Sequence, residues 1–159
     1  MNLVALAPFW LVSAFLAALA AAALEDGWRL RISNLIPLAI MLLAVVAFAL
    51  AGLHIALWQN LTLFAALLVV GTFLFSARLL GGGDVKLLAS CGLWFDLSGG
   101  WRMLVTVAIA GGLLAMLILS VRLFVPEGPH RWILLKRKSG IPYGVAIAAG
   151  ASVATAILR

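Results

Sequence analysis

Long apolar runs, separated by short polar segments, make up almost the whole chain. A membrane-spanning helix needs about 20 apolar residues, and the runs Leu3–Leu24, Met103–Val125 and Ile141–Leu158 come close to this length. The stretch from Ile32 to Ala77 contains no Asp, Glu, Lys or Arg, and it has room for two helices with a turn near Gly52–Asn60. The alternation of a β-barrel is absent. The pattern predicts an all-α fold, a polytopic membrane helical bundle.

The segment Val85–Leu97 is the weakest candidate span, because its charged residues leave only Leu87–Phe95 uncharged. If it crosses the membrane, all but Arg102 and Arg159 of the 11 Lys and Arg residues lie on one side. If it does not cross, the basic residues divide almost evenly. Cytoplasmic loops carry an excess of Lys and Arg, so the distribution favours about six transmembrane helices with both termini outside the cytoplasm.

Composition supports a membrane protein and narrows the other possibilities. The chain is 66% hydrophobic and 10% charged, whereas soluble proteins are roughly 45–50% apolar and about 25% charged. Its 159 residues fit one domain, 1–159. The net charge of +6 is spread between apolar runs, which suits anionic membrane lipids and not nucleic acid. Cys91 is the single cysteine, so no CxxC pair exists, and we expect no metal and no cofactor.

The first apolar run also bears on processing. No Lys or Arg precedes it, although a cleaved signal peptide normally begins with a positively charged region. We therefore expect Leu3–Leu24 to be a retained transmembrane helix.

The glycine run that ends at Asp84 is the strongest candidate for chemistry. An ionisable side chain near bilayer depth costs a few kcal/mol and marks a functional site, and glycines allow another backbone to approach closely. The six-span topology places Asp26, at the exit of the first span, on the same side as Asp84. Two neighbouring carboxylates that share one proton can hydrolyse a peptide bond without a metal.

Both acids also have an ordinary interpretation. Asp26 could pair with the arginines that follow it, and Asp84 with Lys86. Alternatively, Lys86 could bind an acidic group of a substrate or tune Asp84. Glu25 directly precedes Asp26, so position alone does not settle which of the two acids serves. The competing function is a non-enzymatic membrane scaffold, or a proton- or ion-linked transporter component of a secretion or pilus system.

Three segments, in order, resemble the prepilin peptidase family, the membrane aspartic proteases with a GxGD motif. Gly81-Gly82-Gly83-Asp84 fits that motif. Asp26–Asn34 has the family's spacing between an aspartate and an Ile-Pro-Asn stretch, with Ser33 in place of the proline. Ile141–Gly150 resembles the family's closing helix. The resemblance implies a GxGD aspartyl protease architecture.

The same resemblance implies an aspartic endopeptidase of the bacterial inner membrane, with Asp26 and Asp84 as the catalytic pair. Gly81 and Gly83 would be the motif glycines. The implied substrates are type IV pilin-like precursors, cut after a basic leader peptide at the cytoplasmic face, and pilus assembly or secretion proteins are candidate partners.

Larger members of the family carry an N-terminal cytoplasmic region with paired cysteines, and they also methylate the new N-terminus. The sequence shows neither this region nor the paired cysteines. It therefore resembles the short, peptidase-only branch of the tight-adherence (Flp-type) pili, for which we expect no methyltransferase activity.

Overall fold

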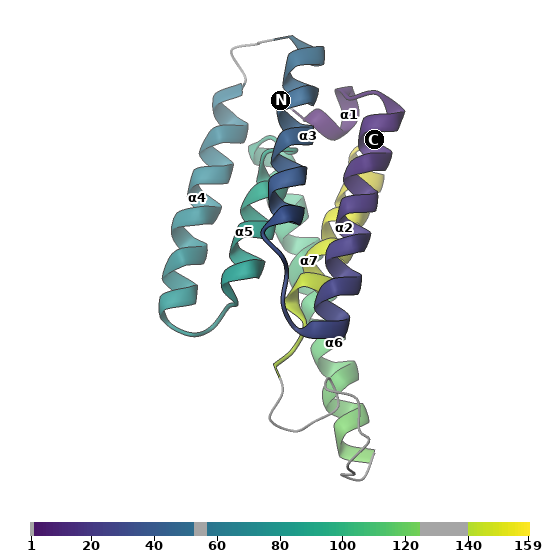
Figure 1. Ribbon diagram of the computed structural model, residues 1–159, viewed down its shortest axis with the longest axis vertical. Coiled ribbons are helices and arrows are strands. Elements are labelled where there is room, and N and C mark those ends of the chain that lie inside the picture. The colour runs from purple at the N-terminus through teal and green to yellow at the C-terminus, as the bar shows by residue number, and fades with distance from the viewer. Residues whose placement is uncertain (1, 53–56, 125–139) are drawn as a thin grey trace.

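The computed structural model describes residues 2–52, 57–124 and 140–159, and these residues are all-α. Figure 1 shows the six longer helices along one common direction, with both chain termini at the same end of the bundle. The guanidinium of Arg159 lies 5.0 Å from the ring of Phe9, which ties these ends together. The helices are α1 (Leu3–Leu6), α2 (Phe9–Arg29), α3 (Leu35–Ala51), α4 (Leu57–Ser76), α5 (Gly82–Gly92), α6 (Leu97–Phe124) and α7 (Tyr143–Leu158).

Three helices, α2, α4 and α6, are long and apolar enough to cross a membrane, and α3 and α7 are shorter apolar helices. Large apolar side chains on their outer faces are exposed, as Phe73 (73%) and Leu123 (76%) illustrate. Such a surface is typical of a protein embedded in lipid. The structure confirms the all-α class with candidate membrane spans among the described residues, while the number of crossings stays a prediction.

The first predicted span, Leu3–Leu24, differs from the structure at both ends. Proline cannot donate the backbone hydrogen bond of a helix interior. The helix is therefore interrupted at Pro8, between α1 and α2. Helix α2 then continues to Arg29, through the first half of the predicted polar loop Glu25–Asn34, although Asp26 and Gly27 are weak helix formers. Leu30, in the left-handed conformation with φ 53°, ends the helix.

Helix α5 is shorter than the predicted segment Val85–Leu97 and begins within the glycine run. Its 11 residues cannot cross a bilayer alone, but it is enclosed by α3, α4 and α7, and most of its side chains are buried. The Asn60 amide donates to the carbonyls of Leu93 (2.9 Å) and Phe95 (3.0 Å). These bonds satisfy backbone groups just beyond the short helix, as the bilayer interior requires.

The predicted boundaries around the other loops also shift. Asn60, expected in the turn Gly52–Asn60, is a buried residue of α4. Helix α6 begins at Leu97, before the predicted Met103, because Asp96 caps it by accepting the N–H of Gly99 at 2.7 Å. Residues 53–56 of that turn, and residues 126–139 in the predicted connection between the runs Met103–Val125 and Ile141–Leu158, lie outside the described residues.

Helices α6 and α7 pack closely against each other. A Cβ atom at Gly150 would collide with the backbone of Val107, and the Thr106 hydroxyl donates to the Gly150 carbonyl at 2.8 Å. Small residues allow this kind of close approach between membrane helices. The contact fixes α7 against the long α6, which extends beyond the other helices in Figure 1.

Candidate active site

Asp26 lies in the last turns of α2, and its carboxylate is held by the start of α7. The Oδ2 atom accepts the backbone N–H of Gly144 at 2.7 Å, and the residue is only 5% exposed. The first N–H groups of a helix have no partner within the helix, so a helix N-terminus favours a negative charge. The fold thus gives Asp26 a fixed orientation through a residue that is distant in sequence.

Asp84 occupies the first turn of α5, which Gly81 precedes as the N-cap residue. Its side chain reaches back to the backbone N–H of Gly81, as an acid at the third helical position does in a capping box. The residues that make this arrangement are neighbours in the chain. Each of the two acids therefore has its carboxylate at the N-terminus of a helix.

Both carboxylates face one open pocket of about 760 Å³, and Asp84 interacts electrostatically with Asp26. The pocket lies between the end of α2, the link from α4 to α5, and the start of α7. A second, smaller pocket of about 250 Å³ also touches both acids. Two carboxylates in one partly buried site cannot both ionise cheaply, so they titrate as a pair. The fold brings the two predicted site acids together.

The motif glycines differ in the space around them. A Cβ atom at Gly81 would lie 2.7 Å from Asp84 Oδ2, and one at Gly83 would lie 3.1 Å from Ile32 Cβ. At Gly82 the nearest atom, in the Phe75 ring, is 3.4 Å away, which is close to ordinary contact. The first and third glycines therefore occupy the more restricted positions.

Ile32 and Gly144 belong to the site, although the sequence did not single them out. A Cβ atom at Gly144 would lie 2.6 Å from Ile32 Cδ1 and 2.8 Å from Asp26 Oδ2. Ile32 thus contacts the first turns of both α5 and α7, and it sets the spacing between them. Pro142 before Gly144 marks a helix start in the sequence, but nothing there connects this start with Asp26.

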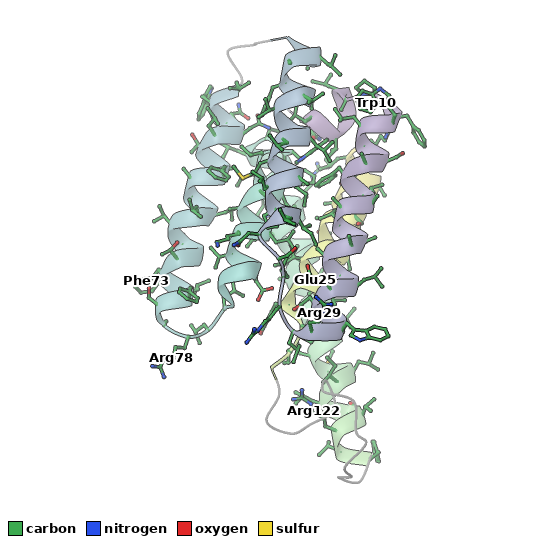
Figure 2. All side chains as sticks on the ribbon, in the orientation of Figure 1. Trp10, Glu25, Arg29, Phe73, Arg78 and Arg122 are labelled. Carbon is green, nitrogen blue, oxygen red and sulfur yellow. The ribbon has the colours of Figure 1, made fainter. Side chains whose placement is uncertain are left out.

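Arg122, on α6, contacts the segment that leads into α7. Its guanidinium donates to the carbonyl of Gly140 at 3.2 Å, and Gly140 lines the larger pocket. Figure 2 shows Arg122 on the extended part of α6, with Arg29 and Arg78 at the same end of the bundle and Trp10 at the opposite end.

Glu25 accepts a hydrogen bond from a different part of the chain than its neighbour Asp26 does. Its Oε2 atom accepts the backbone N–H of Ser33 at 3.0 Å, which folds the link after α2 back onto that helix. Successive helical residues point about 100° apart, so Glu25 does not line the pocket that Asp26 lines. The geometry favours Asp26 as the reacting acid.

We expect Glu25→Gln to retain most of the peptidase activity that the family resemblance implies, because the amide oxygen can still accept the Ser33 N–H. The measurement is the rate at which a pilin-like precursor is shortened, with the amount of protein in the membrane as a reference. Loss of cleavage in Glu25→Gln together with an active Asp26→Asn variant would transfer the catalytic role to Glu25.

Lys86 does not line either pocket of the two acids. Its Nζ atom donates to Asn34 Oδ1 at 2.8 Å, and its side chain borders a separate groove between α3 and α4. The structure therefore gives Lys86 a partner other than Asp84.

Comparison with known proteins supplies the family. A sequence model of the type IV leader peptidase family matches residues 13–121, which include Asp26, the glycine run and Asp84 but not α7. Searches of curated proteins and of solved structures gave no match. The matched region covers more than half of the 159 residues. The chain therefore belongs to the type IV leader peptidase family, the aspartic endopeptidases that process prepilins.

Proposed function

We propose that Asp26 and Asp84 are the catalytic pair of this peptidase, and that it removes basic leader peptides from type IV pilin-like precursors. One observation carries the proposal: two acids from distant parts of the chain face the same pocket, each with its carboxylate at the N-terminus of a helix. Membership of the family supplies the reaction class.

The chemistry follows from one proton held between two carboxylates. The ionised carboxylate takes a proton from the attacking water, while the protonated one donates a hydrogen bond to the scissile carbonyl. When the tetrahedral intermediate collapses, the leaving amine receives a proton from the pair. The hydrogen bonds from Gly144 and Gly81 keep both carboxylates oriented throughout, so that little reorganisation is needed in the transition state.

The proposed substrate enters from the membrane. Its apolar segment would form a membrane helix, and the scissile bond would lie just beyond the apolar part. The pocket suits such a peptide because apolar side chains, among them Phe75, Leu79 and Tyr143, border the two acids. Arg78 lies at the same opening.

The proposal includes a single domain of six spans in the inner membrane, with the two acids at the cytoplasmic side. Arg29 and Arg78 lie at the end of the bundle that carries the acids (Figure 2), while Arg159 lies near Phe9 at the other end. Cytoplasmic ends are rich in such cations. The termini, which share the other end, would then lie outside the cytoplasm, and α5 would provide the fourth crossing.

Single-cysteine labelling tests this topology. Ala77 and Ser98 are exposed residues on the two sides of α5, and the native Cys91 is fully buried. In intact cells, a membrane-impermeant maleimide should label Ser98→Cys from outside and should reach Ala77→Cys only after lysis. Labelling of both from the same side would remove the fourth crossing.

The finer assignment is the peptidase-only, Flp-type branch, without methyl transfer. The direct test of the function is cleavage of a purified Flp-type precursor by the purified protein, followed by mass analysis of the new N-terminus. The product should be shortened and should carry a free, unmethylated amine even with a methyl donor present. An uncut precursor would overturn the proposed substrate, and a methylated product would overturn the branch.

A further inference from the structure

Helices α3 and α4 leave a groove between them, and α5 forms its floor. Among the described residues, both helices pack against α5 rather than extensively against each other, and Figure 1 shows α4 at one edge of the bundle. The groove has a volume of about 290 Å³. It is lined mainly by apolar side chains, among them Leu38 and Met41 from α3 and Phe64 and Leu68 from α4.

One end of this groove is cationic. Lys86 on α5 and Asn34 just before α3 both line it, and the Lys86 ammonium donates to Asn34 Oδ1 at 2.8 Å. An ammonium group has three N–H donors, and Asn34 uses one of them. Lys86 is exposed and lies near the start of α5. Its ammonium group therefore lies at one end of the groove, and the apolar side chains line the rest.

Charge complementarity identifies the occupant. The groove combines an apolar lining with the exposed ammonium of Lys86 at one end. The acyl chain of a lipid would lie on the apolar lining, and its phosphate would lie at the cationic end. Basic pockets between membrane helices on the cytoplasmic side bind anionic lipid head groups in this way.

We propose that the groove between α3 and α4 is a binding site for an anionic phospholipid. The acyl chain lies along Leu38, Met41 and Phe64, and the phosphate binds to Lys86. The site is separate from the pocket of the two acids, and its occupation does not depend on peptide cleavage. A negative result for lipid binding would therefore leave the proposed function unaffected, and the reverse also holds.

Lipid retention by the purified protein tests this site. The full chain in detergent micelles is mixed with phosphatidylglycerol or with phosphatidylcholine of the same acyl chains, and bound lipid is measured by native mass spectrometry. The wild-type protein should retain phosphatidylglycerol preferentially. Lys86→Gln should weaken that retention about fivefold, the contribution of one cation near an anionic lipid.

The matched control is Arg29→Gln, which removes an exposed cation from the same end of the bundle but outside the groove. It should retain phosphatidylglycerol as the wild type does. Leu38→Trp is a second variant, since Leu38 is 51% exposed and a larger ring there fills the groove without entering the core. It should also lower retention, although Lys86 is intact.

Each other outcome overturns the proposal. Equal retention by Lys86→Gln and the wild type would show that Lys86 does not bind the lipid. Full retention by Leu38→Trp, with loss in Lys86→Gln, would place the lipid on the surface and outside the groove. Unchanged lipid retention combined with a raised KM for the precursor in Lys86→Gln would assign the groove to the substrate helix.

Discussion

Replacing Asp26 or Asp84 by Asn will reduce precursor cleavage about 10²–10⁴-fold, the usual contribution of a general acid or base. Each Asn keeps an oxygen that can accept the N–H of Gly144 or Gly81. The fold and the membrane content should therefore be unchanged. The measurement is the initial rate of leader removal from a purified precursor, with thermal unfolding in detergent as the check on folding.

A shared proton also predicts the cleavage rate of the double variant. If the two acids act as one unit, Asp26→Asn with Asp84→Asn should be little slower than either single variant, because each change alone already disables the pair. The wild-type rate should also pass through a maximum with pH, since only the singly protonated pair reacts. Additive losses in the double variant would contradict a joint role.

Asp96 provides the matched control for these variants. Its carboxylate accepts the Ser98 hydroxyl and the Gly99 N–H at the start of α6, away from the pocket. Asp96→Asn should retain the wild-type rate. If it abolished cleavage as Asp84→Asn does, the loss would reflect the removal of an acid from the membrane fold and not the removal of a catalytic group.

Gly144→Ala will give a stable but nearly inactive protein. Its Cβ atom would lie 2.8 Å from Asp26 Oδ2 and 2.6 Å from Ile32 Cδ1, so Asp26 must move away from α7. A displacement of about 1 Å can cost about 100-fold in rate. Alanine is also a better helix former than glycine, by about 1 kcal/mol, and this offsets part of the crowding. The rate of cleavage and the melting temperature should therefore change independently.

Two further variants locate the cause of that loss. In Gly27→Ala the new methyl group meets Val145 at 3.8 Å, an ordinary contact, and the rate should stay near the wild-type value. Adding Ile32→Val to Gly144→Ala removes the Cδ1 atom and should restore part of the activity. An active Gly144→Ala protein, or no rescue by Ile32→Val, would remove the proposed positioning role of these residues.

The sequence predicted the outline of the site for a local reason. The glycine run and Asp84 are neighbours in the chain, so the motif was visible in the sequence, although the start of α5 at Gly82 and its capping by Asp84 were not predicted. Asp26 was found through its distance to Asn34 and through the charge pattern. The partners Gly144 and Ile32 were missed, because they meet Asp26 only after α2 and α7 pack together.

Helix boundaries were less accurate than helix positions. Polar residues after Leu24 indicated a loop, yet α2 continues to Arg29, since charged residues can extend a helix beyond its apolar part. The segment that contains α5 was the weakest predicted span, although the charge pattern favoured a crossing. In the structure the neighbouring helices enclose α5, and Asn60 satisfies the carbonyls of Leu93 and Phe95 beyond its end. Its crossing of the membrane stays a prediction.

The sequence by itself determined the membrane setting, the all-α class and the two candidate acids, because apolar content, helical length and motif spacing are local properties. Only the tertiary structure decided what each polar side chain does. It turned Asp26 toward Gly144, Glu25 toward Ser33 and Lys86 toward Asn34. The physical reason is that a hydrogen-bond partner distant in sequence is chosen by helix packing, which no single segment encodes.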